Sequence, residues 1–382
     1  HLTITGGTTT ANATVAGDGT VTTVAGTGIQ ADAITLTWTD ATFSTAELTA
    51  SSYSTALTLE RPWVVKASNI IATQTSAAGA TIIPGEEIPQ DPVSYLDWNA
   101  SSRSLEEQTC TTYTNLSEAL SEGYTLTSGW YVVDRDITVA QRIICSGDVH
   151  LILKDGSTLT LSKGISVNSN NSLTVYGQSE GDEKGEIVAR CQGYSDAAIG
   201  SSWGDAGTIT INGGHISTRA TGANTTGLGA AQEGRHGSVV INGGVVEAVG
   251  EYCAAIGAGY HATLDSIVIN GGVVRASKSG GFGAAIGSGT GDWGYDAFEV
   301  GAITITGGTV TATASSLGAA IGGGGAQMSG GNVGSGGSGG KIAITGGEVT
   351  ATNTGRGAAI GGGGSNGGTG GSGGTIRISG GI

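Results

Sequence analysis

Acidic side chains supply the first candidates for chemistry in this chain of 382 residues. Six of them recur through its middle and three more cluster between Gly287 and Gly301: Asp196, Asp205, Glu233, Glu247, Glu251, Asp265, Asp292, Asp296 and Glu299. Paired carboxylates, or a carboxylate beside Arg or Lys, can serve as acid and base in glycan cleavage. The competing interpretation, which we favour, is a solvated ladder of surface charges in which Glu247 and Arg275 point outward from neighbouring repeats. We therefore assign no catalytic residue.

Aromatic residues in predicted loops are the second set of candidates: Trp203, Tyr252, Tyr260, Phe282, Trp293 and Tyr295. An exposed Trp or Tyr presents a flat apolar face with a polar tip, which suits stacking on a sugar ring. The competing role is covering the core. We predict Trp203, Tyr260, Trp293 and Tyr295 as ligand-binding residues on one edge of the fold.

The four cysteines and the glycine runs indicate no metal or cofactor. Cys110, Cys145, Cys191 and Cys253 lack the CxxC spacing of a zinc site. Cys110 and Cys145 could form a disulfide near the start of the repetitive region, or they could be buried free thiols. The glycine runs lack the following Asp of a calcium-binding roll and the Gly-Lys-Ser/Thr of a phosphate loop. We interpret these runs, such as 361–374, as extended polyproline-II-like strands packed on one another.

Composition excludes several classes of partner. The net charge is −15 and no basic stripe occurs, so nucleic acid and anionic membrane are poor partners. No run of 18 apolar residues exists, so no membrane span is expected. The chain begins at His1 rather than Met, and we interpret it as a processed or truncated piece of a longer protein.

A repeat organises the C-terminal part of the chain. An alternating strand ending in Gly-Gly recurs six times, at 209–214, 239–244, 267–272, 303–308, 342–347 and 376–381. All copies except the last are followed by a second alternating run, such as Val310-Thr311-Ala312. A third element, of the type Ala-Ile-Gly, recurs at 198–200, 255–257, 285–287, 320–322 and 359–361. The related copy at 229–232 reads Gly-Ala-Ala-Gln and departs from this pattern.

This pattern predicts an all-β fold, a right-handed parallel β-helix (β-solenoid) with Gly-rich coils, preceded by a small β-module. Alternation sends Ile, Val and Ala inward and Thr, Asn and Ser outward. Inward alanines such as Ala255 and Ala320 predict a narrow interior. Variable repeat length places insertions at one corner.

Three regions follow from these patterns. Residues 1–90 hold the end of a preceding repeat, Leu2–Gly7, and a small β-module with strands at 33–39, 57–59 and 63–65. Residues 91–128 form a linker and solenoid cap, with one helix at 114–122 capped by Asn115 or Ser117. Residues 129–382 form the solenoid, and Trp130 and Tyr131 are expected to cover its open end.

The entrance to this repeat resembles that of large repetitive surface proteins of gut-dwelling bacteria. The resemblance is carried by Gly129–Val133, Gly147–Leu153 and Leu173–Gln178, which precede the Gly-Gly coils. Tyr95–Trp98 resembles the start of a new unit in these proteins. The resemblance covers almost the whole chain and is specific for architecture. It implies a surface or carbohydrate-binding protein and carries over no catalytic motif.

Three functions remain open on this evidence. The first is a secreted or cell-surface structural or adhesin module that binds a glycan or a host surface. The second is a carbohydrate-active enzyme, a glycoside hydrolase or polysaccharide lyase built on a β-helix. The third is a self-associating filament or surface-layer component. Repeat strands at both termini, without a cap pattern, predict end-to-end self-association or a longer repetitive chain.

Overall fold

The structure is a computed structural model that describes residues 2–3, 13–15, 19–23, 91–291, 295–328 and 333–382. Its contacts divide the chain into two units, His1–Asp91 and Pro92–Ile382. In the first unit, β1 (Leu2–Thr3) pairs in parallel with β3 (Gly19–Thr23), which pairs antiparallel with β2 (Ala13–Val15). The strands predicted at 33–39, 57–59 and 63–65, and residues 4–7 of the predicted coil, lie outside the described residues.

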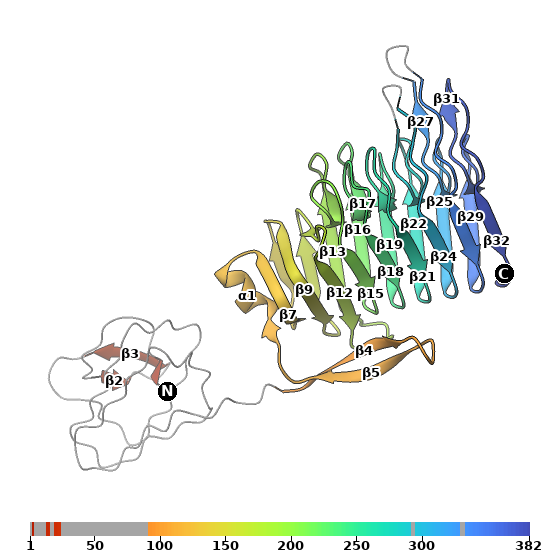
Figure 1. Cartoon of the computed structure of the whole chain (residues 1–382). Coiled ribbons are helices and arrows are strands. Elements are labelled where there is room, and N and C mark those ends of the chain that lie inside the picture. Colours follow the sequence, from red (N-terminus) through yellow and green to blue (C-terminus); the bar gives the residue numbers. More distant parts are fainter. Residues whose placement is uncertain (1, 4–12, 16–18, 24–90, 292–294, 329–332) are drawn as a thin grey trace. The chain divides into compact units, whose positions relative to one another are not determined.

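The second unit is a stack of coils, each contributing one strand to each of three parallel faces (Figure 1). The first face consists of the Ile-rich strands before the Gly-Gly corner, the second of the strands after that corner, and the third of the Ala-Ile-Gly strands. The predicted fold class, an all-β parallel β-helix, is confirmed. The strands of the three faces have the following bounds.

The first face contains β6 (Thr114–Asn115), the C-terminal halves of β7 (Thr125–Val133) and β9 (Ile143–Leu153), β12 (Ser172–Gly177), β15 (Thr208–Ile211), β18 (Ser238–Ile241), β21 (Ser266–Ile269), β24 (Ala302–Ile305), β28 (Lys341–Ile344) and β32 (Thr375–Ile378). The second contains β8 (Ile137–Val139), β10 (Thr158–Leu161), β13 (Glu186–Cys191), β16 (His215–Ala220), β19 (Val245–Gly250), β22 (Val273–Lys278), β25 (Thr309–Ala314) and β29 (Glu348–Asn353). The third contains the start of β9, β11 (Ile165–Ser166), β14 (Ala197–Gly200), β17 (Thr226–Ala230), β20 (Ile256–Ala258), β23 (Ile286–Gly287), β26 (Ile321–Gly322) and β30 (Ile360–Gly361).

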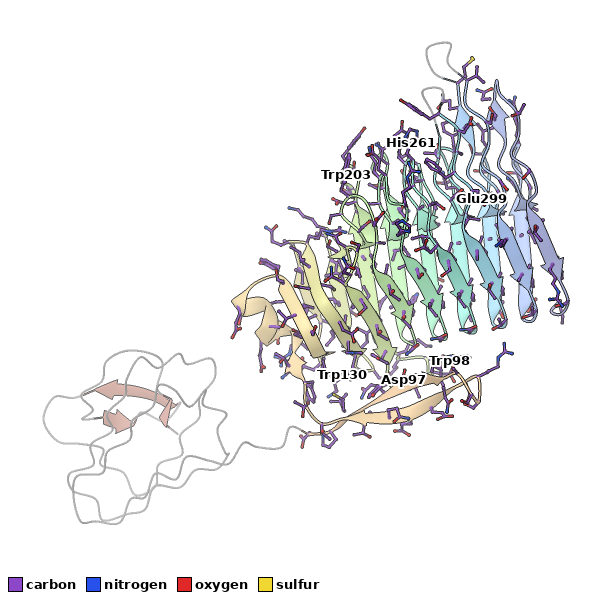
Figure 2. All side chains as sticks on the ribbon, in the orientation of Figure 1. Asp97, Trp98, Trp130, Trp203, His261 and Glu299 are labelled. Atoms are coloured by element: carbon purple, nitrogen blue, oxygen red, sulfur yellow. The ribbon has the colours of Figure 1, made fainter. Side chains whose placement is uncertain are left out.

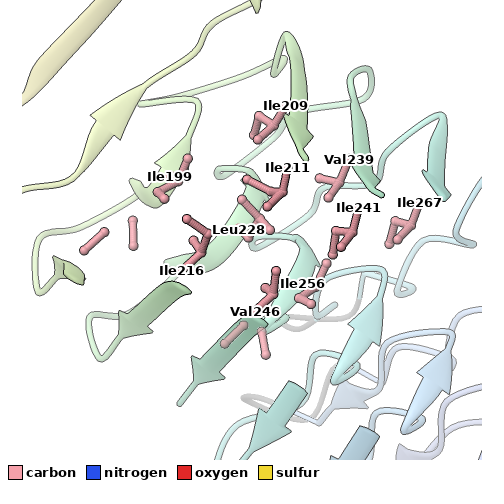
Figure 3. Packing of buried hydrophobic residues seen from close by; sticks show 14 of the residues in the cluster. Ile199, Ile209, Ile211, Ile216, Leu228, Val239, Ile241, Val246, Ile256 and Ile267 are labelled. Atoms are coloured by element: carbon pink, nitrogen blue, oxygen red, sulfur yellow. The ribbon is translucent and has the colours of Figure 1, made fainter. Parts of the chain in front are cut away.

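Inward side chains of equivalent positions stack on one another from coil to coil. On the first face, Ile209 pairs with Val239 and Val239 with Ile267, and all three are fully buried (Figure 3). Ala255 and Ala320 of the third face are also fully buried. A single coil cannot bury such a face alone, so the stacking itself creates the core.

Glycine at the corners permits successive coils to approach through their backbones. Gly244 has a φ of 75°, and a Cβ there would lie 2.5 Å from the carbonyl oxygen of Gly214. A side chain at this position would be strained in conformation and would collide with the preceding coil. The Gly-Gly pair is therefore a requirement of coil stacking.

The N-terminal end of the solenoid is covered by a helix, α1 (Leu116–Glu122) (Figure 1). Leu116 is fully buried, and Ala119 and Leu120 pack against the core. The predicted helix is thus confirmed with Asn115 as its first boundary residue, although the side chain of Asn115 makes no cap hydrogen bond. The expectation that Trp130 and Tyr131 cover this end is wrong, because Tyr131 points into the core and Trp130 lies on the outer side of the first face.

A β-hairpin, β4 (Val93–Asn99) and β5 (Ser104–Cys110), packs on the outside of the first coils. Its Val93, Tyr95 and Cys110 meet the outward side chains Val132, Ile152 and Tyr176. Trp130 joins this contact, with its ring centroid 4.9 Å from that of Tyr95 and 4.3 Å from that of His150.

A ladder of amide side chains continues from the hairpin along the Gly-Gly corner. Asn212 donates to Asp97 of β4 over 2.7 Å, Asn242 donates to Asn212 over 2.7 Å, and Asn270 donates to Asn242 over 2.8 Å. Thr306 ends this run by donating to the Asn270 oxygen over 2.8 Å. Each buried amide in the run thus has its partner on the next coil, as buried polar groups require.

The disulfide suggested for Cys110 and Cys145 is not formed, and all four cysteines are free and buried. The wall of the first face separates the two thiols, because Cys110 lies under the hairpin and Cys145 lies in the solenoid interior. Burial raises the pKa of the Cys145 thiol to about 12. The Cys110 thiol instead donates to the carbonyl oxygen of Thr112.

The corner between the third and first faces, which we call the insertion corner, carries the longest loops. These loops lengthen toward the C-terminus, where β27 (Ala326–Gln327) and β31 (Ser365–Asn366) stand out in them (Figure 1). Glycine segments in these loops bond to one another, as where Gly337 donates to Gly324 over 2.8 Å and Gly363 donates to Gly337 over 2.9 Å. This side-chain-free packing agrees with the expected extended glycine strands.

Enlarging an inward alanine should destabilise the fold. We expect Ala255→Leu and Ala320→Leu to lower the free energy of unfolding by about 1–3 kcal/mol each, because the added carbons have no room between stacked coils. Chemical denaturation measures the change. Ala343→Leu, at an outward position of β28, is the control and should cost much less. Melting of all three variants like the parent would contradict the narrow interior.

Interrupting the amide ladder should also cost stability. Asn242→Ala removes two hydrogen bonds and leaves the Asn212 oxygen and the Asn270 amide group without their partners, so we expect a loss of about 1–3 kcal/mol. Thr345→Ala, three coils further along the same row and exposed, should change stability by less than about 0.5 kcal/mol. Equal denaturation midpoints for the two variants would show that the ladder contributes nothing.

Candidate functional site

Four successive coils place equivalent dipeptides at the insertion corner: Trp203-Gly204, Gln232-Glu233, Tyr260-His261 and Thr290-Gly291. Backbone hydrogen bonds fix this register. Gly204 donates to Gln232, Glu233 donates to Tyr260, and His261 donates to Thr290, over 2.8, 2.9 and 3.0 Å. The second residue of each dipeptide lies four residues after a glycine of the third-face strand on the same coil. These glycines are Gly200, Gly229, Gly257 and Gly287. The corner therefore displays one aligned row of side chains along the rod.

Aromatic rings gather at this corner around His261. The Tyr260 ring stacks on the His261 ring with a centroid distance of 4.0 Å, and the Tyr295 ring meets it edge-on at 4.9 Å. Phe298 lies edge-on to the same imidazole at 6.3 Å, and the Arg235 guanidinium lies 4.0 Å above the Phe298 ring. Three consecutive coils thus build one cluster with several ring faces.

Two large rings at this corner are open to solvent. Trp203 is 55% exposed and Tyr295 is 63% exposed. Figure 2 shows Trp203 and His261 at the tips of loops on the same edge of the solenoid. Exposed aromatic surface on the loops of a rigid scaffold is typical of a binding surface.

The backbone of this row adopts the left-handed conformation in three successive coils. Gly204 has a φ of 71°, and the equivalent Glu233 and His261 have φ values of 61° and 50°. Glycine takes this conformation without steric cost, whereas Glu and His are strained in it by about 1 kcal/mol or more. Such strain at non-glycine residues tends to cluster at functional sites.

The predicted ligand-binding residues are partly brought together. Trp203, Tyr260 and Tyr295 lie on the insertion corner, whereas Trp293 lies outside the described residues. Two further aromatic candidates, Tyr252 and Phe282, instead lie at the corner between the second and third faces. The sequence interpretation named Glu233 only as a candidate acid, and it missed His261, Arg235 and Phe298. The constant four-residue offset from the third-face strand could have placed Glu233 and His261 in one row.

Most of the candidate carboxylates bind the protein itself. Asp205 accepts the backbone N–H groups of Arg235 and His236, and Asp265 accepts that of Gly237. Asp296 accepts the N–H of Ser335 in the next coil. These acids tie the loop of one coil to that of a neighbour, which leaves them poorly placed for catalysis. Asp292 lies outside the described residues.

The acids of the second face form the expected surface ladder. Arg275 donates to Glu247 over 3.1 Å, which confirms the outward pairing expected for these two residues. The His215 ring lies between Glu186 and Glu247, at 3.4 and 3.6 Å from their oxygens. A protein imidazole thus occupies the space that a scissile bond would need between two catalytic carboxylates. Glu251 pairs with Arg219 over 2.8 Å.

Among the described residues, no group of three or more His, Cys, Asp and Glu side chains could hold a metal ion. In the same part of the chain, no helix is long and apolar enough to cross a membrane. Comparison of the chain with protein-family models, with curated proteins and with solved structures finds no match. The geometry of the insertion corner is therefore the feature of this chain that points to a function.

One buried cation lies outside this site, at the end of β22. Lys278 is 2% exposed, and its ammonium donates to the carbonyl oxygens of Glu251 and Gly280. Burial lowers its pKa to about 8, although the nearby Cys253 and Glu251 favour the charged form. The equivalent positions in the flanking coils are Gly250 and Ala314, so this lysine fills space that a small residue leaves open.

Lys278 should make stability depend on alkaline pH. Because its folded pKa lies below its unfolded value, the unfolded chain binds more protons between about pH 8 and 10.5, and stability rises with pH across that window. The contribution is at most roughly 3 kcal/mol. Buried thiols act in the opposite direction, so the measurement is the difference between the parent and Lys278→Met in denaturation from pH 7 to 10.5. A difference that does not change with pH would contradict the buried cation.

Proposed function

We propose that this chain is a secreted or cell-surface structural module, of the adhesin type, whose insertion corner binds glycans. The observation that carries the proposal is the gathering of aromatic residues on three of four successive coils at the insertion corner, with Trp203 and Tyr295 exposed and Tyr260 stacked on His261. Sugar rings present apolar C–H faces that stack on such rings, while their hydroxyls need nearby polar groups. Glu233 and Arg235, both exposed, lie on the coil between Trp203 and Tyr260.

The scaffold supports this role because it holds the rings in place before a ligand arrives. The backbone bonds of Gly204, Glu233 and His261 tie each loop to the next. A preorganised surface loses little conformational entropy on binding, so a few stacking contacts give useful affinity. A surface location fits the sparse charge, 12% of residues, and the Thr-, Ser- and Asn-rich exterior.

The enzyme alternative has less support from the same geometry. The candidate acids at the insertion corner accept backbone N–H groups, and those of the second face flank a histidine or pair with arginines. Self-association stays a prediction. Ile376 and Ile378 of β32 are 41% and 63% exposed, whereas the equivalent Ile342 and Ile344 are nearly buried.

Removing an exposed ring should weaken glycan binding without unfolding the rod. We expect Trp203→Ala and Tyr295→Ala each to reduce affinity for a glycan identified on an array by roughly tenfold, since a stacking contact is worth about 1 kcal/mol or more. Calorimetric titration measures the affinity, and circular dichroism checks the fold.

Tyr124→Ala is the matched control, because Tyr124 is 44% exposed but lies beside α1, away from the insertion corner. Its removal should leave affinity unchanged. Binding that is lost equally in all three variants would show that the contact lies elsewhere, and a folded parent chain that binds no glycan on the array would overturn the proposed function.

A further inference from the structure

We propose that the ligand of the insertion corner is a neutral, extended oligosaccharide that runs along the rod axis over Trp203, Glu233 and the Tyr260–His261 pair. This inference rests on the proposed function and adds the direction, the length and the charge of the ligand. The row then forms three successive sugar-binding positions, which are aromatic at Trp203, polar at Glu233 and aromatic at Tyr260.

The spacing of the row sets the length of the ligand. Trp203 and Tyr260 occupy equivalent positions two coils apart, with Gln232 on the coil between them. Two strand separations amount to about 10 Å. Sugar residues in an extended chain advance by about one strand separation each, so stacking on both aromatic positions requires at least three residues. A single sugar can reach only one of the two.

Glu233 supplies the polar position in the middle of the row. Its carboxylate can only accept hydrogen bonds, which suits the hydroxyl donors of a sugar. The neighbouring Gln232 is buried and fixed, because its oxygen accepts bonds from Ser195 and Asn224 over 2.6 and 2.9 Å. The Gln232 amide group also donates to the Glu233 carboxylate over 3.4 Å. The side chain of Glu233 is thereby oriented although it is exposed.

The backbone of Glu233 gives independent support for a role in binding. This residue is left-handed at the position where the preceding coil has Gly204. Glycine would relieve the strain, and no core contact requires a carboxylate here. A strained glutamate in place of glycine is therefore better explained by what its side chain binds than by stability.

Charge around the row favours a neutral sugar. Five carboxylates lie at this edge, on Asp205, Glu233, Asp265, Asp296 and Glu299. These carboxylates outnumber the nearby positive groups, Arg235, which lies over the Phe298 ring, and His236, which contacts Asp265. A uronate or sulfated sugar would meet an excess of like charge, which disfavours it.

The first arm of the experiment varies the ligand. The full chain is titrated with neutral gluco-, manno- and xylo-oligosaccharides of one to six residues, and with oligogalacturonates of the same lengths. We expect affinity for one neutral series to rise at least tenfold between one and three residues and to level off beyond about four. Affinity independent of length, tighter binding of the galacturonates, or no binding to any neutral series would overturn this inference. The glycan array tests the proposed function separately, since another ligand could still bind there.

The second arm tests Glu233. Glu233→Gly should keep or raise the melting temperature, because glycine relieves the left-handed strain, yet it should reduce affinity for the trisaccharide by roughly tenfold. Arg103→Gly is the matched control, since Arg103 is also exposed and left-handed, with a φ of 55°, but lies in the turn between β4 and β5, away from the insertion corner. It should likewise keep or raise the melting temperature and leave affinity unchanged. Full trisaccharide affinity in Glu233→Gly would remove Glu233 from the site.

Discussion

Hydrogen bonding between the backbones of successive coils is the interaction on which the rest of this structure depends. Every coil repeats the strands of its neighbour at one strand separation, so any residue has its equivalents directly above and below. Inward side chains at equivalent positions must then be of similar size in each coil. The corners must also let the backbones of neighbouring coils approach closely. These demands explain the stacked Ile209, Val239 and Ile267 and the glycine at position 244.

The same constraint makes it informative when a coil carries a different residue from its neighbours at an equivalent position. Where stacking requires glycine, as at Gly244, a substitution is excluded by collision with the preceding coil. At the insertion corner the constraint is weaker, because a Cβ on Gly204 meets no neighbouring atom. Side chains are therefore sterically allowed in this row, although a residue other than glycine is strained in the left-handed conformation. Glu233 and His261 are two such residues.

The fold could be predicted from the sequence, but the site could be predicted only in part. Period-two alternation and the six Gly-Gly corners are local patterns, and stacking converts them directly into architecture. Trp203, Tyr260 and Tyr295 were predicted because large rings in loops are conspicuous. His261 was missed because its role depends on the rings of Tyr295 and Phe298 from the next coil. The hairpin contact with Val132 and Ile152, which separates Cys110 from Cys145, is likewise a long-range contact without a local signature.

The amide ladder and the candidate site occupy the same four coils. Asn212, Asn242, Asn270 and Thr306 each follow the insertion loop that carries, in turn, Trp203, Glu233, His261 and Tyr295. Asp97 of the hairpin accepts the bond at the first end of this ladder. A row of stacking positions is useful only if the separation between coils stays constant, since a small displacement misplaces every ring relative to its sugar. Buried side-chain bonds on the Gly-Gly corner restrain that separation for the loops at the insertion corner. In the function that we propose, the ladder contributes to ligand positioning through the coils that it joins, although none of its members lies at the site.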